Sequence, residues 1–309
     1  MICRICANEH NNESLVARDI LHDINREFEY YRCSSCGCLQ IAQVPSDMSC
    51  FYGESYYSLQ ADPFDKLNFS EKLFDRLKDY LIFFHSRRAC GLSSKSPIHR
   101  KWLTMVPWDK DKSILDVGCG HGVLLRRLHR LGFKKLCGID AFIDKDIVIG
   151  EDCWLRKRTL ENTEGQFDLI ILSHSLEHMS DQHSAMASVK RLLAPGGKVV
   201  VLIPIFSTYF YEKYNDCWYS WDVPRHFYLH SLESFGRLAS DSGLKVEKRV
   251  LYSFLNCILE SERRLAKFRS DSQAILRIKN YTLSDWRRET NRINSQSKSD
   301  CCNFLLTHL

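Results

Sequence analysis

Long hydrophobic runs are missing from this sequence. None of its 309 residues lies in an apolar stretch of about eighteen residues, the length that a membrane-spanning helix needs, so we expect no membrane span. The first residues, Met1 to Cys6, also lack the hydrophobic segment of a signal peptide. We therefore expect a cytoplasmic protein. Because that compartment is reducing, its 14 cysteines are expected to be thiols or metal ligands rather than disulfides.

A strong net charge is missing as well. The 43 Lys and Arg residues nearly balance 38 Asp and Glu residues, which leaves a net charge of +5. The excess lies in residues 245–292, where twelve basic residues stand against six acidic ones. This basic segment could attract phosphate, in a sugar nucleotide or in RNA, or it could be a solvated helical face. The hydrophobic share of 44% is that of a globular protein with a sizeable core.

Two pairs of cysteines lie near the N-terminus. Cys3 and Cys6 form one Cys-x-x-Cys pair, and Cys33 and Cys36 form another. Four thiolates in two such pairs predict a tetrahedral Zn²⁺ site, and four sulfur ligands leave no open position, so this metal would be structural. Cys38 is an alternative ligand, and a set of reduced, partly buried cysteines is the other explanation.

The chain divides by composition into three parts. We predict a zinc-ribbon-like domain in residues 1–50, an aromatic connector with helices in residues 51–112, and a larger domain in residues 113–309. The ribbon is too small to form a core alone, so bound metal would supply its folding energy. Within the connector, the apolar pattern predicts one helix at 63–90 and a second, shorter helix at 99–105.

A short apolar strand, a glycine-rich turn and a helix start follow one another in the larger domain. Asp116 lies near the end of the strand, Gly118, Gly120 and Gly122 follow, and a helical pattern begins at Val123. This order is typical of a nucleotide site at the carboxyl edge of a parallel sheet. In dinucleotide-binding proteins, Gly-x-Gly-x-x-Gly seats a pyrophosphate. Here the third glycine comes one residue earlier, and an acid before the turn suits a cation better than a phosphate. A tight turn without a ligand is the alternative.

Further strands are predicted downstream of this turn. Residues 135–140 form the second strand, and Asp140 at its end is expected to accept hydrogen bonds from ribose hydroxyls, unless it is only a turn residue. A weak third strand is expected at 152–155. The remaining strands are expected at 169–172, after the Pro-Gly-Gly turn at 195–197, at 244–251 and at 303–308, with a basic helical insertion at 254–298.

Three of these stretches resemble the motifs of class I S-adenosylmethionine (SAM) methyltransferases. They are the glycine turn, the segment Phe167–Met179 and the segment Leu192–Pro204. The resemblance implies an α/β fold with a Rossmann-like, seven-stranded sheet, and SAM as the cofactor. It also implies that the glycines face the methionine and ribose of SAM, with Asp116 near its ammonium group. The segment Asp222–Phe235 is similar to bacterial methyltransferases that pair this domain with an N-terminal zinc-binding segment. That group includes sugar C-methyltransferases acting on nucleotide-linked deoxysugars.

Residues 205–230 are rich in aromatic side chains, and we expect them to form a lid over the cofactor. The aromatics either stack on a sugar or base, or only pack the lid against the body. His174, His178 and His226 are candidates for the general base, because a methyl acceptor must lose a proton and histidine titrates near neutral pH. A capping role for His178 and a pocket-lining role for His174 are the alternatives. Arg225 could bind a phosphate or carboxylate.

We therefore predict a SAM-dependent methyltransferase that acts on a small metabolite, for which a nucleotide-linked sugar or glycan precursor is one candidate. One alternative is an RNA methyltransferase that grips phosphates with its ribbon and basic segment. The other is a non-catalytic scaffold anchored by zinc. The basic residues of the ribbon are matched by acidic ones, which disfavours nucleic acid. The sequence does not distinguish C-, O- and N-methylation.

Overall fold

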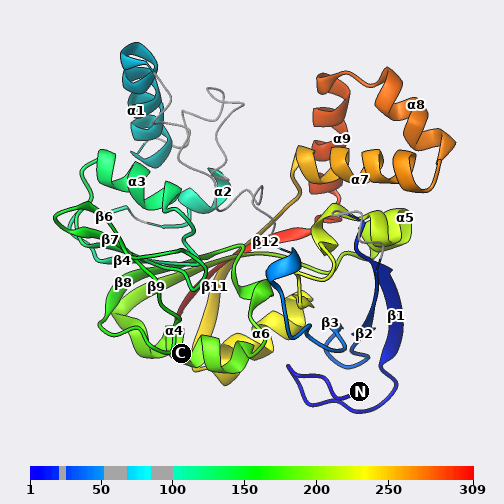
Figure 1. Ribbon diagram of the computed structural model, residues 1–309, viewed down its shortest axis with the longest axis horizontal. Coiled ribbons are helices and arrows are strands. Elements are labelled where there is room, and N and C mark those ends of the chain that lie inside the picture. Colours follow the sequence, from blue (N-terminus) through cyan, green and yellow to red (C-terminus); the bar gives the residue numbers. More distant parts are fainter. Residues whose placement is uncertain (21–25, 52–67, 85–99, 107) are drawn as a thin grey trace.

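The main body of the protein is an eight-stranded mixed sheet. The computed structural model describes residues 1–20, 26–51, 68–84, 100–106 and 108–309. The strand order in the main sheet is β11-β12-β9-β8-β4-β5-β7-β6 (Figure 1). The parallel strands are β4 (Ile114–Val117), β5 (Leu136–Ile139), β7 (Cys153–Arg156), β8 (Phe167–Ser173) and β9 (Leu193–Pro204). The predicted Rossmann-like α/β fold is confirmed.

The two ends of this sheet are antiparallel. Strand β12 (Cys301–His308) lies between β9 and β11 (Leu244–Tyr252) and runs against both. At the other end, β6 (Ile147–Gly150) pairs antiparallel with β7. Strand β6 makes the sheet eight-stranded, where the sequence predicts seven. It forms a hairpin with β7, so that the short stretch Ile147–Gly150 pairs at the sheet edge.

Helices cover both faces of the sheet (Figure 1). Helix α3 (Val123–Arg130) packs Leu125 and Leu128 into one core. Helices α4 (Gln182–Leu192) and α6 (Leu232–Asp241) pack into a second core on the opposite face. Successive residues of the central strands point to opposite faces, so that Ile170 joins one core and Ile171 the other.

The N-terminal segment forms a second, four-stranded sheet. Its order is β1 (Glu13–Arg18), β2 (Glu27–Arg32), β3 (Leu39–Ile41) and β10 (Tyr228–Leu229). A short 3-10 helix, η1 (Ser49–Phe51), follows β3. Strand β10 belongs to the segment after β9, so this small sheet is completed by the main body. Its buried residues belong to the same core as α4 and α6.

Helix α1 (Phe69–Phe84) lies over α3, and the short helix α2 (Arg100–Leu103) adds to the same core. Asp79 of α1 and Arg127 of α3 form a buried ion pair, with 3.0 Å between Nε and Oδ2. The ends of the predicted connector helices, at 63–67, 85–90 and 99, lie outside the described residues.

The segment between β9 and β10 contains α5 (Thr208–Tyr214) and the 3-10 helices η5 (Asn215–Cys217) and η6 (Tyr219–Trp221). Helices α7 (Leu255–Phe268), α8 (Ser272–Asn280) and α9 (Leu283–Ser295) lie between β11 and β12. Figure 1 shows these three helices as a group that stands off the sheet. The carboxylate of Asp300 links the segment between β9 and β10 to the segment between β11 and β12. It accepts hydrogen bonds from Trp218 and Ser220 of the first and from Ser253 of the second, at 2.6–3.0 Å. In the described part of the chain, no helix has the length and apolar character needed to cross a membrane.

Candidate functional site

The glycine turn after β4 approaches its neighbours so closely that side chains are excluded. Gly118 has φ +73°, and a Cβ atom added there would lie 2.5 Å from Cβ of Ser175. Gly122 also has φ +73°, and its added Cβ would lie 2.7 Å from Leu155. Any larger residue at these positions would be strained and would clash. The close approach to Ser175 places the turn directly beside the segment that follows β8.

Two carboxylates flank this turn at the carboxyl ends of β4 and β5. Asp140 accepts hydrogen bonds from the backbone N–H of Gly120 at 2.9 Å and of Phe142 at 2.8 Å. Asp116 is only 4% exposed. Burial, reinforced by the charge of Asp140, raises the pKa of Asp116 to about 7. A cation bound here would favour its ionised form. The structure thus brings together all five predicted cofactor residues: Asp116, Gly118, Gly120, Gly122 and Asp140.

A buried glutamate lies at the centre of the three predicted histidines. Glu177, in the 3-10 helix η4 (Leu176–His178), is 1% exposed. Its Oε1 lies 3.4 Å from Nδ1 of His174 and 4.0 Å from Nε2 of His226. The rings of His178 and His226 are 4.8 Å apart. Burial alone would raise the pKa of Glu177, but the hydrogen bond and the charges of the histidines lower it.

The backbone fixes which ring nitrogens carry protons. Nδ1 of His226 lies 2.8 Å from the carbonyl oxygen of Ser220, and Nδ1 of His178 lies 2.9 Å from that of Arg225. A carbonyl can only accept, so Nδ1 is the protonated nitrogen in each neutral ring and Nε2 carries the lone pair. Burial and the nearby charge of His178 lower the pKa of His226 to about 4. At neutral pH its Nε2 is therefore unprotonated.

Glu177 was not among the predicted site residues. Its signal is present in the sequence, since Leu-Glu-His follows the fourth strand, but acidic residues at strand ends are common. Only the folded chain shows that this carboxylate is buried among three histidines.

Arg225 is used inside the protein rather than presented to a ligand. It is fully buried, its Nε donates to Asp222 at 2.9 Å, and its Nη1 donates to the carbonyl of Phe51 at 3.1 Å. Burial would raise the pKa of Asp222, but the hydrogen bond and charge of Arg225 hold it well below its usual range. The expectation that Arg225 binds a phosphate or carboxylate of the substrate therefore finds no support.

The large aromatic residues between β9 and β10 pack against one another. Trp218 and Trp221 have no exposed surface. Trp218 stacks on Phe210 with 5.8 Å between ring centroids, and Trp221 contacts Tyr30 of β2 edge-on at 5.4 Å. Of the two roles predicted for the aromatics, these rings serve packing.

The four predicted zinc ligands lie together. The sulfurs of Cys3 and Cys36 are 3.7 Å apart, those of Cys6 and Cys33 are 3.5 Å apart, and all four are within 4.8 Å of one another. A Zn²⁺ ion with Zn–S bonds of about 2.3 Å requires tetrahedral S–S distances of about 3.8 Å. The hydrogen bond from Cys36 lowers the pKa of Cys3, while that of Cys36 is raised.

Protein N–H groups also point at these sulfurs. Gln40 Nε2 lies 2.9 Å from Sγ of Cys3, and the backbone N–H of Ile5 lies 3.4 Å from the same sulfur. Such donors stabilise thiolates and orient metal ligands. Cys38, the alternative ligand, lies instead 3.9 Å from Nδ1 of His230. The donor set therefore fits a tetrahedral ion held by Cys3, Cys6, Cys33 and Cys36.

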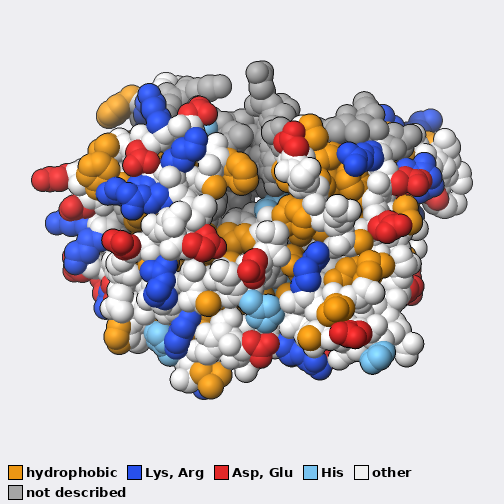
Figure 2. Space-filling model, turned by 60° about the horizontal axis from the view of Figure 1, so that its bottom comes forward, with side chains coloured by type: hydrophobic (Ala, Val, Ile, Leu, Met, Phe, Trp, Pro, Cys, Tyr) orange, Lys and Arg blue, Asp and Glu red, His pale blue; other side chains and the backbone are white. Residues whose placement is uncertain are grey.

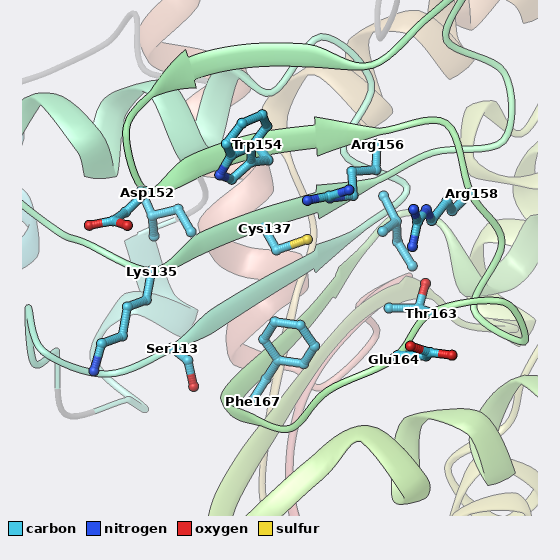
Figure 3. A pocket seen from close by; sticks show the side chains of 12 residues that line it. Ser113, Lys135, Cys137, Asp152, Trp154, Arg156, Arg158, Thr163, Glu164 and Phe167 are labelled. Atoms are coloured by element: carbon cyan, nitrogen blue, oxygen red, sulfur yellow. The ribbon is translucent and has the colours of Figure 1, made fainter.

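A cavity of about 410 Å³ lies away from the glycine turn. Figure 3 shows it over β5 and β7, with Cys137, Trp154, Arg156 and Phe167 around it. Its lining contains none of the predicted cofactor or histidine residues. The chemistry suggested by the sequence thus lies at the carboxyl ends of β4, β5 and β8 rather than in this cavity.

Comparison with known proteins identifies related domains. Residues 86–249 match the family described as a methyltransferase domain. The ubiquinone biosynthesis O-methyltransferase of Nitrosococcus oceani is 37% identical over 99 residues, which cover 28% of this chain and 42% of that protein. The protein of the same name from Pseudomonas aeruginosa is 26% identical over 115 residues, 34% of this chain and 49% of that protein. The matched stretches span less than half of either relative.

Solved structures give weaker similarities. Geranyl diphosphate C-methyltransferase from Streptomyces coelicolor, solved with Mg²⁺, geranyl diphosphate and S-adenosyl-L-homocysteine, has a TM-score of 0.43 at 15% identity, over 65% of this chain and 73% of that one. Phosphoethanolamine N-methyltransferase 2 from Haemonchus contortus has a TM-score of 0.46 at 14% identity, over 96% of this chain and 68% of that one.

Proposed function

The chain belongs to the methyltransferase domain family, and on that premise we propose that it transfers the methyl group of SAM to a small-molecule acceptor. The observation that supports this most is a contact between two parts of the site. The glycine turn beside Asp116 and Asp140 touches Ser175, two residues before Glu177. A cofactor site and a proton-accepting cluster are therefore adjacent.

In this proposal, five residues hold SAM at the ends of β4 and β5. Asp116 attracts its ammonium group, Asp140 takes the ribose hydroxyls, and the glycines 118, 120 and 122 let the backbone approach the ligand. SAM, when bound, supplies a methyl group already activated on a sulfonium. The buried carboxylate of Asp116, with its raised pKa, suits a positively charged partner.

We propose His226 as the general base. Its Nε2 accepts the proton that leaves the acceptor, and the carboxylate of Glu177, 4.0 Å away, stabilises the resulting imidazolium. His178 and His174 stand beside it as the second and third candidates, since both contact the same cluster. Glu177 acts as a positioning residue, because it touches the histidines rather than the reacting atoms.

The acceptor class is a further part of the proposal. A nucleotide-linked sugar or glycan precursor is the class favoured by the sequence resemblance. The curated relatives are named as O-methyltransferases of ubiquinone biosynthesis, which adds small-molecule hydroxyl acceptors to the compounds that need testing.

RNA is disfavoured as the acceptor. Arg4 donates to the carbonyl of Ile41 at 2.6 Å, and the guanidinium of Arg32 lies over the ring of Phe206 at 4.6 Å, so two ribbon cations are used within the protein. On the face seen in Figure 2, Lys and Arg side chains are interspersed with Asp and Glu. This mixed pattern lacks the continuous strip of basic side chains that would bind the phosphates of RNA.

We also propose a structural Zn²⁺ ion in the N-terminal segment, held by Cys3, Cys6, Cys33 and Cys36. The division into a ribbon (1–50), a connector (51–112) and a methyltransferase domain (113–309) with a lid at 205–230 and an insertion at 254–298 belongs to the same proposal. Because β10 pairs with β3, we expect the ribbon and the lid to unfold together.

Titration of SAM by calorimetry tests the cofactor site. We expect micromolar binding to the zinc-loaded protein and its loss in Asp116→Ala and Asp140→Ala. Asp144→Ala, which removes an exposed carboxylate of the following loop, is the matched control. If the folded, zinc-loaded protein does not bind SAM, the proposed methyltransferase activity is wrong and the non-catalytic scaffold is the alternative.

Turnover of a screened acceptor tests the base. His226→Gln should lower kcat by about 10²–10⁴ with little change in SAM affinity. Glu177→Gln should shift the acidic limb of the pH–rate profile as well as lower kcat, which a merely structural role would not do. Unchanged kcat in His226→Gln would move the assignment to His178 or His174.

A further inference from the structure

Helices α7–α9 carry an apolar patch at their outer end. Five large apolar side chains are between 38% and 55% exposed there, within a stretch of sixteen residues: Phe268, Ile275, Leu276, Tyr281 and Leu283. We call them the α8 patch. Figure 1 shows α8 as the outermost helix of the group. Contiguous exposed apolar side chains of this kind mark an interaction surface.

Helix α8 turns its apolar side outward. Its exposed face carries residues at the i, i+3, i+4 and i+7 positions, namely Ser272, Ile275, Leu276 and Lys279. On the inner side, Ala274 is buried, Ile278 packs against the core, and Arg277 donates to Glu262 of α7 at 2.8 Å. Two large aliphatic side chains, Ile275 and Leu276, nevertheless remain on the exposed side and are available to a partner.

Basic residues are frequent in the sequence around the patch. Residues 267–288 contain six Lys and Arg residues and two Asp residues. Both acidic side chains serve as helix caps, since Asp271 accepts from the N–H of Ala274 at 2.7 Å and Asp285 accepts from that of Thr282 at 2.9 Å. Three of the six cations are ion-paired within the protein: Arg269 with Asp216, Arg277 with Glu262 and Arg288 with Asp285. Lys279 and Arg287 are exposed and lie close in the sequence to the apolar side chains.

Aliphatic side chains beside exposed cations, here Lys279 and Arg287, are complementary to an anionic lipid surface. The apolar groups enter the boundary between headgroups and acyl chains, and the cations meet lipid phosphates. Single-stranded nucleic acid would favour aromatic rings for base stacking, whereas Ile275, Leu276 and Leu283 are aliphatic. We propose that the α8 patch docks this protein on an anionic membrane.

The patch is rigidly connected to the segment that precedes the candidate base. Ser261 of α7 accepts a hydrogen bond from the N–H of Tyr219 at 2.9 Å, and Glu262 accepts one from the hydroxyl of Tyr214 at 3.0 Å. The guanidinium of Arg264 lies over the ring of Tyr219 at 4.8 Å. A docked membrane would therefore stand in a fixed position relative to residues 205–230, which would suit an acceptor that partitions into lipid.

Vesicle flotation with the full, zinc-loaded chain tests this docking. We would compare phosphatidylcholine vesicles with vesicles that contain about one quarter phosphatidylglycerol. Binding is expected to the anionic vesicles and to weaken with salt. The double variant Ile275→Ser/Leu276→Ser should lower the partition coefficient at least tenfold, and Lys279→Gln/Arg287→Gln should lower it mainly at low salt. Because these side chains are exposed, thermal unfolding should change little.

The matched control is Val148→Ser/Leu309→Ser, which removes two apolar side chains that are 60% and 78% exposed elsewhere on the molecule. An equal loss of binding in this control would overturn the proposal, as would wild-type binding that does not respond to the α8 variants. Absence of vesicle binding together with salt-dependent retention of single-stranded RNA would assign the patch to nucleic acid instead. None of these results depends on methyl transfer.

Discussion

The hydroxyl of Tyr30 donates a hydrogen bond of 3.1 Å to the main-chain carbonyl oxygen of His226. Strand β2 of the N-terminal sheet therefore holds the backbone of the segment that carries the proposed base. A second link lies nearby, where the hydroxyl of Ser231 donates to the carbonyl of Cys36 at 2.5 Å. The N-terminal segment thus contacts the backbone next to the candidate site through two hydrogen bonds.

Removing the Tyr30 hydroxyl should weaken this support. Tyr30→Phe leaves the carbonyl of His226 buried without its donor, at an expected cost of about 1 kcal/mol in the free energy of unfolding. We expect kcat to fall several-fold while SAM affinity stays unchanged. Urea unfolding and steady-state kinetics measure the two effects. Tyr31→Phe, whose hydroxyl bonds to Ile2 and Gln40 within the ribbon, is the control and should leave kcat unaltered.

Removing the proposed zinc should unfold the ribbon. Cys36→Ser or a strong chelator takes away one ligand or the whole ion, and with it several kcal/mol of metal-binding energy. Elemental analysis should show about one Zn²⁺ per chain in the wild type and none in Cys36→Ser, with a lower Tm. Cys50→Ser, at an exposed thiol, should keep both metal and Tm. A metal-free wild type with normal stability would contradict the zinc assignment.

Part of this architecture could be predicted from the sequence because its signals are local. Glycines 118 and 122 predict a tight backbone turn, and in the structure a larger residue does not fit at either position. The apolar run before Pro204 predicts a buried strand. The last apolar stretch, residues 303–308, is expected to supply a strand, and it lies in β12. Its position between β9 and β11 is seen only in the structure.

Other features depend on contacts between distant residues and left no local signal. Strand β10 is two residues long, and it pairs Tyr228 with Gln40, a residue far away in the sequence. The burial of Glu177 and the pairing of Arg225 with Asp222 depend in the same way on packing between segments. Charge and residue type at one position do not reveal whether a side chain faces a ligand or a buried partner.

Binding of SAM should strengthen as pH rises through about 7, because the pKa of Asp116 is raised to about 7. Below that pH the carboxyl is protonated and offers no charge to the ammonium group, whereas above it the carboxylate attracts that group. From pH 6.0 to 7.5 we expect a several-fold gain in affinity by calorimetry. Asp116→Asn should bind weakly with a flat profile over this range. A wild-type affinity that is constant over the same range would contradict the proposed contact.

Acid should destabilise the junction of ribbon and body through His230. Burial, with the charge of His183, lowers its pKa to about 3 against the opposing charge of Glu177. Nδ1 of His230 lies 2.9 Å from the hydroxyl oxygen of Ser234, and its Nε2 lies 2.6 Å from Oε1 of Gln182. As the pH falls below about 6.5, this histidine becomes protonated in the unfolded chain but stays neutral in the folded chain. The free energy of unfolding therefore decreases as the pH falls from 6.5 toward 3.

The expected slope is up to about 1.4 kcal/mol per pH unit from this histidine. His230→Asn should lower stability at pH 7 but flatten the slope between pH 6.5 and 4, measured by urea unfolding at several pH values. His10→Asn, at an exposed position, should leave the slope as it is. If both variants kept the wild-type slope, His230 would not be the titrating group.

The buried ion pair between Asp79 and Arg127 should hold α1 against α3. Asp79→Ala leaves a guanidinium that is 5% exposed without its carboxylate, and we expect a cost of about 3–5 kcal/mol in the free energy of unfolding. The double variant Asp79→Ala/Arg127→Leu removes the stranded charge and should recover most of that loss. Urea unfolding of the wild type, Asp79→Ala, Arg127→Leu and the double variant gives the coupling energy between the two side chains. A double variant as unstable as Asp79→Ala would mean that the single substitution acts through lost packing rather than through an uncompensated buried charge.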